Sequence, residues 1–275
     1  MQYPFASLSP EYTSLLARMQ ITRVAKVNAA AKKLIGLIDA GHYKAGCDAT
    51  GVPQIVAAAS FEREASSNFN LNPAQGAPLH QRSTIIPHNG PFNTWTEAQE
   101  AAYELDGLDK IGAANWDWQH ACYEEELFNG FGYRAWGIHS PYLWAGTNNY
   151  TAGKYVADGK FSRTEVDSQL GVIPMMAAIV QMRPDLALPI PLPASIQPGP
   201  RPAPQPAPEG LHDAAALQIA LNDLGADPRL DVDNNYGRQT KYAVMAFQKD
   251  AGIGVDGLAG PQTWAAIEAK LGGAS

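Results

Sequence analysis

The sequence predicts a mainly α-helical protein with two domains, a large helical domain and a small three-helix bundle. Two observations predict this: most of the chain reads as helical segments with recognisable starts, and a proline-rich segment divides it. Ten of the 21 prolines fall within residues 184–208. Because proline fixes φ and lacks an N–H, this segment is expected to be an extended linker. The predicted domains are therefore residues 1–183 and 210–275, with the linker at 184–209.

The large domain is expected to consist mostly of helices. Ser9-Pro10, Pro53 and Thr94 supply caps or a first-turn proline at three of the helix starts. Residues 70–93 are rich in Asn, Pro and Gly, and only STII (83–86) looks extended. A loop or small hairpin is expected there, and a long irregular stretch is typical of a functional rim or a disordered insert. The predicted helices are residues 9–19, 21–40, 53–63, 96–106, 115–126 and 165–182.

The small domain contains an internal repeat. DVDNNYGRQT from residue 231 aligns with GVDGLAGPQT from residue 254, and Val, Asp, Gly, Gln and Thr coincide. Each copy leads into an amphipathic helix, at 241–250 and 263–271, and a third helix is expected at 215–225. Turn residues and Pro261 suit the helix starts. The expected core of this bundle is Leu217, Leu221, Leu224, Val244, Phe247, Trp264 and Ile267.

Residues 214–271 resemble the three-helix peptidoglycan-binding domain found at one end of many cell-wall hydrolases. The motifs that carry the resemblance are LQIALNDLG, DVDNNYGRQTKYAVMAFQ and GVDGLAGPQTW. The resemblance implies a wall-anchoring role, although Asn234-Asn235 stands where the family usually has Gly. By analogy the ligand groove lies near four residues of the first repeat, for which turn chemistry is the alternative explanation. These residues are Asp233, Tyr236, Gly237 and Arg238.

Composition and motifs exclude several classes of protein. A net charge of −7, from 20 basic and 27 acidic residues, argues against a nucleic-acid partner. No apolar run of about 20 residues exists, so no stable membrane association is expected. Cys47 and Cys122 are too few for a disulfide scaffold, and we expect both to be reduced and buried. A thiol peptidase using one of them with His120 is a weaker alternative.

The sequence offers no obvious cofactor site. HExxH, GxSxG and P-loop motifs are absent, and the six histidines form no i,i+4 pair. A zinc amidase therefore lacks an evident ligand set, although scattered ligands stay open. No metal or organic cofactor is predicted.

Carboxylates remain as candidates, and the segment SFEREASSNF at residues 60–69 supplies two. Cleavage of a glycosidic bond needs an acid that keeps its proton near neutral pH, which partial burial provides. At 100° per residue, Glu62 and Glu64 point away from the apolar face in different directions. Only one of them can face a cleft, and helix geometry does not choose between them.

AAASFEREASSNF looks like the helix end of lysozyme-like muramidases. In goose-type lysozymes and lytic transglycosylases the general acid falls on Glu64, and Ala65 replaces the usual Ser. Glu62 stays as the alternate. Residues 13–182 resemble modular phage endolysins, which implies a lysozyme-like helical catalytic domain. The motifs, in order, are EREAS, AQGAPL, IIPHNGPF, WTEAQEAAYEL, FNGFGYR and SPYLWAGTNNYTAGKYV.

The same resemblance places a second carboxylate at Glu126, in YEEELFNG. Because three glutamates follow one another from Glu124 to Glu126, the alignment with the family motif does not fix which of them matches. A solvated acidic face is the structural alternative. Goose-type relatives often work without an evident nucleophile, with a water attacking instead, so Glu126 could also be absent from the mechanism.

Aromatic residues are concentrated between residues 129 and 155, where seven occur in 27 residues. A pyranose ring presents C–H faces and hydroxyl edges, so flat side chains beside amides suit it. About half of the aromatic residues are expected to line the cleft, and the rest to be core. The predicted sugar-binding residues are Tyr133, Trp136, Tyr142, Trp144, Asn148 and Tyr150.

The expected function is that of an endolysin that cuts the glycan strand between N-acetylmuramic acid and N-acetylglucosamine. The alternatives are a lytic transglycosylase on the same bond, a chitinase-like glycosidase, an amidase and a wall-binding protein without activity. The first residues lack a basic region and an apolar run, so no secretory signal is expected. The protein is expected to be a monomer that stays in the host bacterial cytoplasm until lysis and then acts on the wall.

Overall fold

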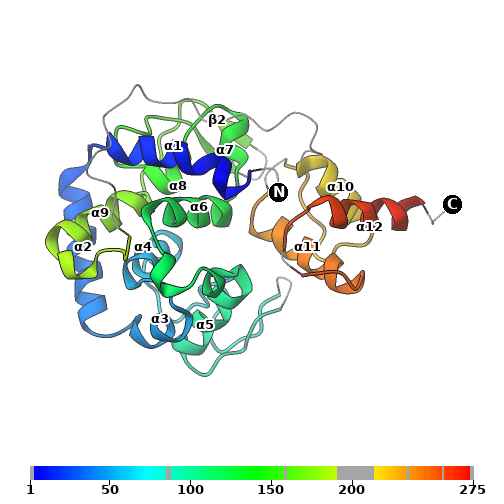
Figure 1. The fold of residues 1–275 in the computed structure, drawn as a ribbon, viewed down its shortest axis with the longest axis horizontal. Coiled ribbons are helices and arrows are strands. Elements are labelled where there is room, and N and C mark those ends of the chain that lie inside the picture. The colour runs from blue at the N-terminus through cyan, green and yellow to red at the C-terminus, as the bar shows by residue number, and fades with distance from the viewer. Residues whose placement is uncertain are drawn as a thin grey trace.

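A computed structural model of the 275-residue chain describes residues 3–84, 88–157, 160–190, 214–233, 236–255 and 257–272. These residues form a large helical domain and a small helical bundle beside it (Figure 1). The described sheet is a two-stranded antiparallel hairpin of β1 (Lys154–Ala157) and β2 (Lys160–Ser162). The prediction of a mainly α-helical fold is confirmed.

The large domain is built around α4. Its residues 55–59 and Phe61 are buried. Helices α2 and α4 pack against α9 and against each other, α1 packs against α6, and α3 packs against α5. The helices are α1 (Phe5–Ala17), α2 (Val24–Asp39), α3 (Lys44–Thr50), α4 (Gln54–Ala65), α5 (Trp95–Asp106), α6 (Trp118–Asn129), α7 (Gly132–Ala135), α8 (Pro141–Trp144) and α9 (Val172–Met182).

Helix starts follow the sequence signals in some cases and not in others. The Thr94 hydroxyl caps α5 by accepting from the Glu97 N–H at 3.2 Å, as its position predicts. Helix α1 begins at Phe5, so Pro10 lies inside the helix rather than at its start. Helix α9 begins at Val172, seven residues after the predicted start. The short helices α3, α7 and α8 and the hairpin were not predicted, because segments this short carry little periodicity.

The packed part of the large domain continues past the predicted boundary at Arg183. A short 3₁₀ turn spans Pro184–Leu186, and Leu188 is buried in the main core. The Ile190 N–H donates to the Trp116 carbonyl oxygen at 3.2 Å. Prolines are tolerated here because the segment runs over the domain as extended chain. The rest of the predicted linker, residues 191–209, lies outside the described residues, as do Ile85 and Ile86 of the STII segment.

Both cysteines are free and buried, as predicted. Burial raises the pKa of the Cys47 thiol to about 12, so the thiol is protonated at neutral pH. In the described part of the chain, no helix has both the length and the apolar character needed to cross a membrane.

The small bundle consists of α10 (Ala214–Asp223), α11 (Arg238–Asp250) and α12 (Pro261–Gly272). Pro261 occupies the first helical position, as predicted. Of the predicted core residues, Leu224 and Trp264 are partly buried and pack against the others. The fully buried members are Leu217, Leu221, Val244, Phe247 and Ile267, joined by Ala220 and Leu230.

Candidate functional site

The last turn of α4 sends three consecutive charged side chains in three directions. Glu62 points to α2, where its Oε2 accepts from Lys33 Nζ at 2.5 Å and from the Ser67 hydroxyl at 2.6 Å. Arg63 points into the domain, and Glu64 lines a pocket between helices. The separation follows from the 100° step of the helix. Glu62 lies on a different surface hollow from Glu64.

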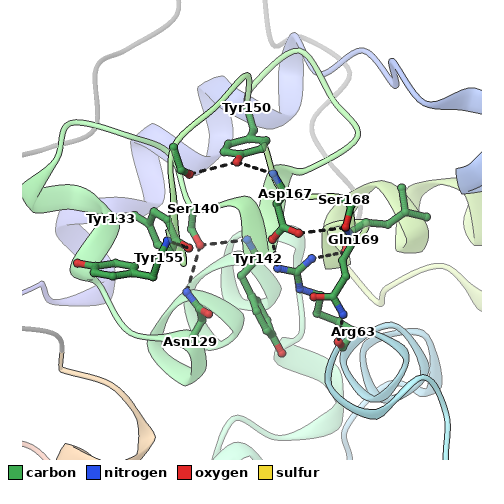
Figure 2. A network of polar contacts seen from close by, with 12 residues as sticks. Arg63, Asn129, Tyr133, Ser140, Tyr142, Tyr150, Tyr155, Asp167, Ser168 and Gln169 are labelled. Atoms are coloured by element: carbon green, nitrogen blue, oxygen red, sulfur yellow. Dashed lines mark hydrogen bonds and ion pairs between the residues drawn. The ribbon is translucent and has the colours of Figure 1, made fainter. Parts of the chain in front are cut away.

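Arg63 anchors the end of α4 to the segment that precedes α9. Its guanidinium donates to Asp167 Oδ2 at 2.6 Å and to the Leu170 carbonyl oxygen at 3.1 Å (Figure 2). Both side chains of this ion pair are buried. The Gln169 side-chain amide donates back to the Arg63 carbonyl oxygen at 3.2 Å. Tyr150 accepts from the Asp167 N–H at 3.0 Å, so the hairpin region braces the same anchor. The network fixes the backbone from which Glu64 projects.

The pocket beside Glu64 lies between α4, α5 and α6 and is narrow, with a cavity volume of about 50 Å³. Its walls are mostly apolar, and acidic side chains from α4, α5 and α6 also line it. Ser60 and Glu64, four residues apart, lie on the same face of α4. The lining side chains include Val56, Phe61, Trp95, Tyr103, Leu127 and Phe128, with the acidic residues Glu64, Asp106, Glu124 and Glu125.

Glu125 is the most buried carboxyl of the pocket, at 4% exposure. Its pKa is raised from 4.5 to about 8, mainly by burial and to a smaller extent by the charges of Glu64, Asp106 and Glu124. A hydrogen bond with Ser60 acts in the opposite direction and lowers the pKa. Within the described part of the chain its Oε2 atom has no hydrogen-bond partner. Glu125 therefore holds a proton at neutral pH beside the more exposed Glu64.

Glu124 is another carboxyl that lines the pocket. Burial raises its pKa to about 7, while the positive charge of Lys241 lowers it. Lys241 belongs to α11 of the small bundle, so the two domains meet at this pocket.

Glu126, the predicted second carboxylate, points away from the pocket. Its Oε2 accepts from Arg134 at 2.7 Å and from the Tyr12 hydroxyl at 2.6 Å, and it is 2% exposed. Arg134 also donates to Glu11 at 2.9 Å. Glu126 therefore joins α1, α6 and α7 through a buried ion pair, and this placement gives it a structural role.

Glu126→Gln is expected to lower the free energy of unfolding by about 2 kcal/mol, because it leaves Arg134 with one buried carboxylate instead of two. Urea unfolding followed by circular dichroism measures this loss. The activity per folded molecule is expected to stay near that of the wild type. A variant as stable as the wild type but inactive would return Glu126 to the catalytic group.

The predicted sugar-binding residues are mostly packed inside the large domain. Trp144 and Tyr150 are buried in its core. Asn148 ties two loops together, accepting from the Gln20 N–H at 2.9 Å and donating to the Arg18 carbonyl oxygen at 3.1 Å. Trp144, Tyr150 and Asn148 therefore have structural contacts where sugar contacts were predicted. The prediction used aromatic enrichment, which does not show which side chains face outward.

Of the other three predicted aromatic residues, one is exposed and two are buried. Trp136 is 39% exposed and stacks on Phe161 with ring centroids 4.6 Å apart. Tyr142 lies under the Arg63 guanidinium and 6.0 Å from Phe128 of the pocket wall. Tyr133 is buried against the hairpin, where its hydroxyl accepts from the Tyr155 N–H (Figure 2). A sugar contact by Trp136 stays a prediction.

The repeat in the small bundle has a structural basis in two buried glutamines. Gln218 binds the first turn: its amide donates to Asp233 at 2.7 Å and to Thr240 at 3.1 Å, and its carbonyl accepts from the Asp233 N–H. Gln248 binds the second turn in the same way. Its amide donates to Thr263 at 2.9 Å and its carbonyl accepts from the Gly257 N–H at 2.9 Å.

The predicted wall-binding residues lie on or beside the first of these turns. Asp233 is tied to Gln218, and the Tyr236 hydroxyl donates to the Gly257 carbonyl oxygen at 2.7 Å. Gly237 is the N-cap of α11, and Arg238 begins this helix, its side chain lying outside the described residues. The hydrogen bonds explain Asp233 and Tyr236 as turn residues, and a contact with the wall stays a prediction.

Comparison with known proteins identifies the small domain. Residues 212–267 match the family described as "Putative peptidoglycan binding domain". The N-acetylmuramoyl-L-alanine amidase CwlM of Mycobacterium tuberculosis (strain ATCC 25618 / H37Rv) is 45% identical over 51 residues, which is 18% of this chain and 12% of that protein. This similarity concerns the binding domain alone. No solved structure matches the chain. The small domain is thus similar to peptidoglycan-binding domains, and the match does not extend to the larger domain.

Sequence reasoning missed Glu125 as a member of the site. The sequence shows a run of three glutamates, but their directions depend on which face of α6 packs toward the pocket. Successive residues on a helix point 100° apart, so the three glutamates cannot all face the Glu64 side. The packing of α6 between α1 and the pocket directs Glu124 and Glu125 to the pocket and Glu126 away from it.

Proposed function

We propose that the protein cleaves the glycan strand of peptidoglycan between N-acetylmuramic acid and N-acetylglucosamine, as a muramidase. The observation that carries the proposal is the position of Glu64 beside Glu125 in an apolar pocket, in a chain that also carries a peptidoglycan-binding domain. Glycoside hydrolysis needs a carboxyl that retains its proton at neutral pH and lies next to the bond that breaks.

The carboxyl pair, Glu64 and Glu125, meets this requirement as a unit. Two neighbouring carboxyls do not both ionise readily, and a coupled pair titrates in two steps that belong to both groups. The raised pKa of Glu125 keeps one proton in the pair at pH 7. Glu64 is the more exposed member, so it is the one that contacts the substrate.

The proposed reaction begins when the proton held by Glu125 is passed by way of Glu64 to the bridging oxygen as the bond from this oxygen to C1 of muramic acid breaks. Water then adds to C1, and its proton returns to the pair. Phe61, Trp95 and Phe128 line the pocket and supply apolar surface beside the carboxyls. The Arg63 anchor holds Glu64 in place during the reaction.

The binding domain contributes by keeping the catalytic domain on an insoluble polymer, which raises the local concentration of glycan bonds. In this proposal the enzyme stays in the host cytoplasm until lysis and then acts on the wall as a monomer.

Mass spectrometry of fragments released from purified sacculi tests this function. Fragments that end in reducing N-acetylmuramic acid are expected. Ends with a 1,6-anhydro bridge would identify a lytic transglycosylase, which uses the same pocket without water. Free muramyl lactate beside free peptide amines would identify an amidase, and cleavage of plain chitin oligomers a chitinase-like enzyme. Intact sacculi with the protein bound to them would leave only the binding function.

A further inference from the structure

The small bundle contacts the large domain through a buried lysine. Lys241 of α11 donates to the backbone carbonyl oxygen of Asp106 at 2.9 Å and to its carboxylate at 3.3 Å. The side chains of Lys241 and Asp106 are only 8% and 10% exposed. A charged side chain is seldom buried to this degree without a specific partner.

The end of α5 is well suited to receive this ammonium group. Asp106 is the last residue of α5, and carbonyl groups at the end of a helix lack partners within it and carry partial negative charge. The turn at Gly257 lies close to the stem of Lys241, since a Cβ at this position would come within 2.9 Å of the Lys241 Cγ.

The contact lies at the candidate site. Lys241 lines the pocket together with Glu64, Glu124 and Glu125, and its charge lowers the pKa of Glu124. The first repeat turn lies next to this contact, because it leads directly into α11, where the Lys241 N–H donates to the Gly237 carbonyl oxygen at 2.9 Å. The turn that is predicted to bind the wall therefore lies on the side of the bundle that contacts the large domain.

We propose that the peptidoglycan-binding domain docks on the rim of the pocket through Lys241 and Asp106, and that wall binding and docking compete. In the docked state the bundle covers one side of the pocket and turns its predicted binding residues inward. Peptidoglycan that engages the bundle releases it from the rim and opens the pocket to a glycan strand. This regulatory consequence rests on the proposed function, whereas the docking itself does not.

Charge reversal and charge exchange test the docking. Lys241→Glu places like charges against each other, so the radius of gyration of the full chain is expected to rise in small-angle X-ray scattering. The rate on soluble glycan fragments is expected to rise about fivefold or more, the size typical of coupling between sites. The double variant Lys241→Glu with Asp106→Lys is expected to restore both values. Lys249→Met, on an exposed part of the same helix, is the control that leaves both unchanged.

The readouts separate the two proposals. An unchanged radius of gyration in a folded Lys241→Glu protein would overturn the docking, whatever the activity. Lys241→Met, which keeps the stem and loses the charge, repeats the test if charge reversal impairs folding. If the radius of gyration rises in Lys241→Glu and returns to the wild-type value in the double variant, docking is supported even if no variant cleaves glycan. The absence of cleavage would then contradict only the proposed hydrolase activity. A larger radius with unchanged activity on soluble fragments would overturn the regulation.

Discussion

Glu64→Gln is expected to slow the clearing of purified sacculi by about 100- to 10,000-fold, the range typical for loss of a general acid. Glutamine has nearly the same shape but no proton to donate at the bridging oxygen. Glu64 is an exposed residue at the end of α4, so the fold and the binding of sacculi by the small bundle are expected to persist. The fall in turbidity measures the rate, and co-sedimentation with sacculi measures binding.

Glu62→Gln is the matched control, because it removes the same charge two residues away on the same turn. The Glu62 carboxylate accepts hydrogen bonds from Lys33 and Ser67 on the other side of the helix. Near wild-type clearing is expected, with a small loss of stability from an ion pair that is partly exposed. If Glu62→Gln were inactive and Glu64→Gln active, Glu62 would be the general acid, and the active site would be the surface hollow that Glu62 lines.

Glu125→Gln is expected to change the pH dependence of both activity and stability. In the wild type the pair loses its proton near pH 8, which sets the alkaline limb of the rate profile. Without Glu125 the remaining carboxyl has fewer like charges around it, so the limb is expected to move to lower pH and the rate at pH 7 to fall. Glu104→Gln, at an exposed position on α5, is the control whose profile stays in place.

The stability effect of Glu125 has a definite sign. Its pKa is raised in the folded state, so the folded protein binds more protons than the unfolded chain between about pH 4.5 and pH 8. The wild type therefore loses stability as the pH rises through this window, by on the order of a few kcal/mol. Glu125→Gln lacks this loss. Urea midpoints of the two proteins that keep the same difference at pH 5 and pH 8 would contradict the raised pKa.

Local sequence signals predicted a useful part of the fold. The cap at Thr94, the first-turn proline at Pro261 and the spacing of Leu217, Val244 and Ile267 gave helices and a core that the structure confirms. These features depend on neighbours in sequence, so pattern reasoning reaches them. The boundary of the large domain was placed too early, since nothing local shows that Leu188 fills a gap in a distant core.

The same reasoning predicted only part of the candidate site. The sequence placed Glu64 at a helix end, but the partner of this carboxyl depends on how α6 is rotated against α4. The burial of Glu126 with Arg134 and the position of Glu125 in the pocket are consequences of that rotation. The role of Lys241 depends on contact between domains, which no motif encodes.

Digestion of purified sacculi in ¹⁸O-labelled water tests the central claim most directly, because the label marks the bond that water cleaves. A muramidase that works through the carboxyl pair is expected to place one ¹⁸O on C1 of the new reducing N-acetylmuramic acid ends, and Glu64→Gln is expected to abolish these labelled ends. Label on the lactyl carboxylate of muramic acid, or labelled C1 ends that persist at full yield in Glu64→Gln, would contradict it.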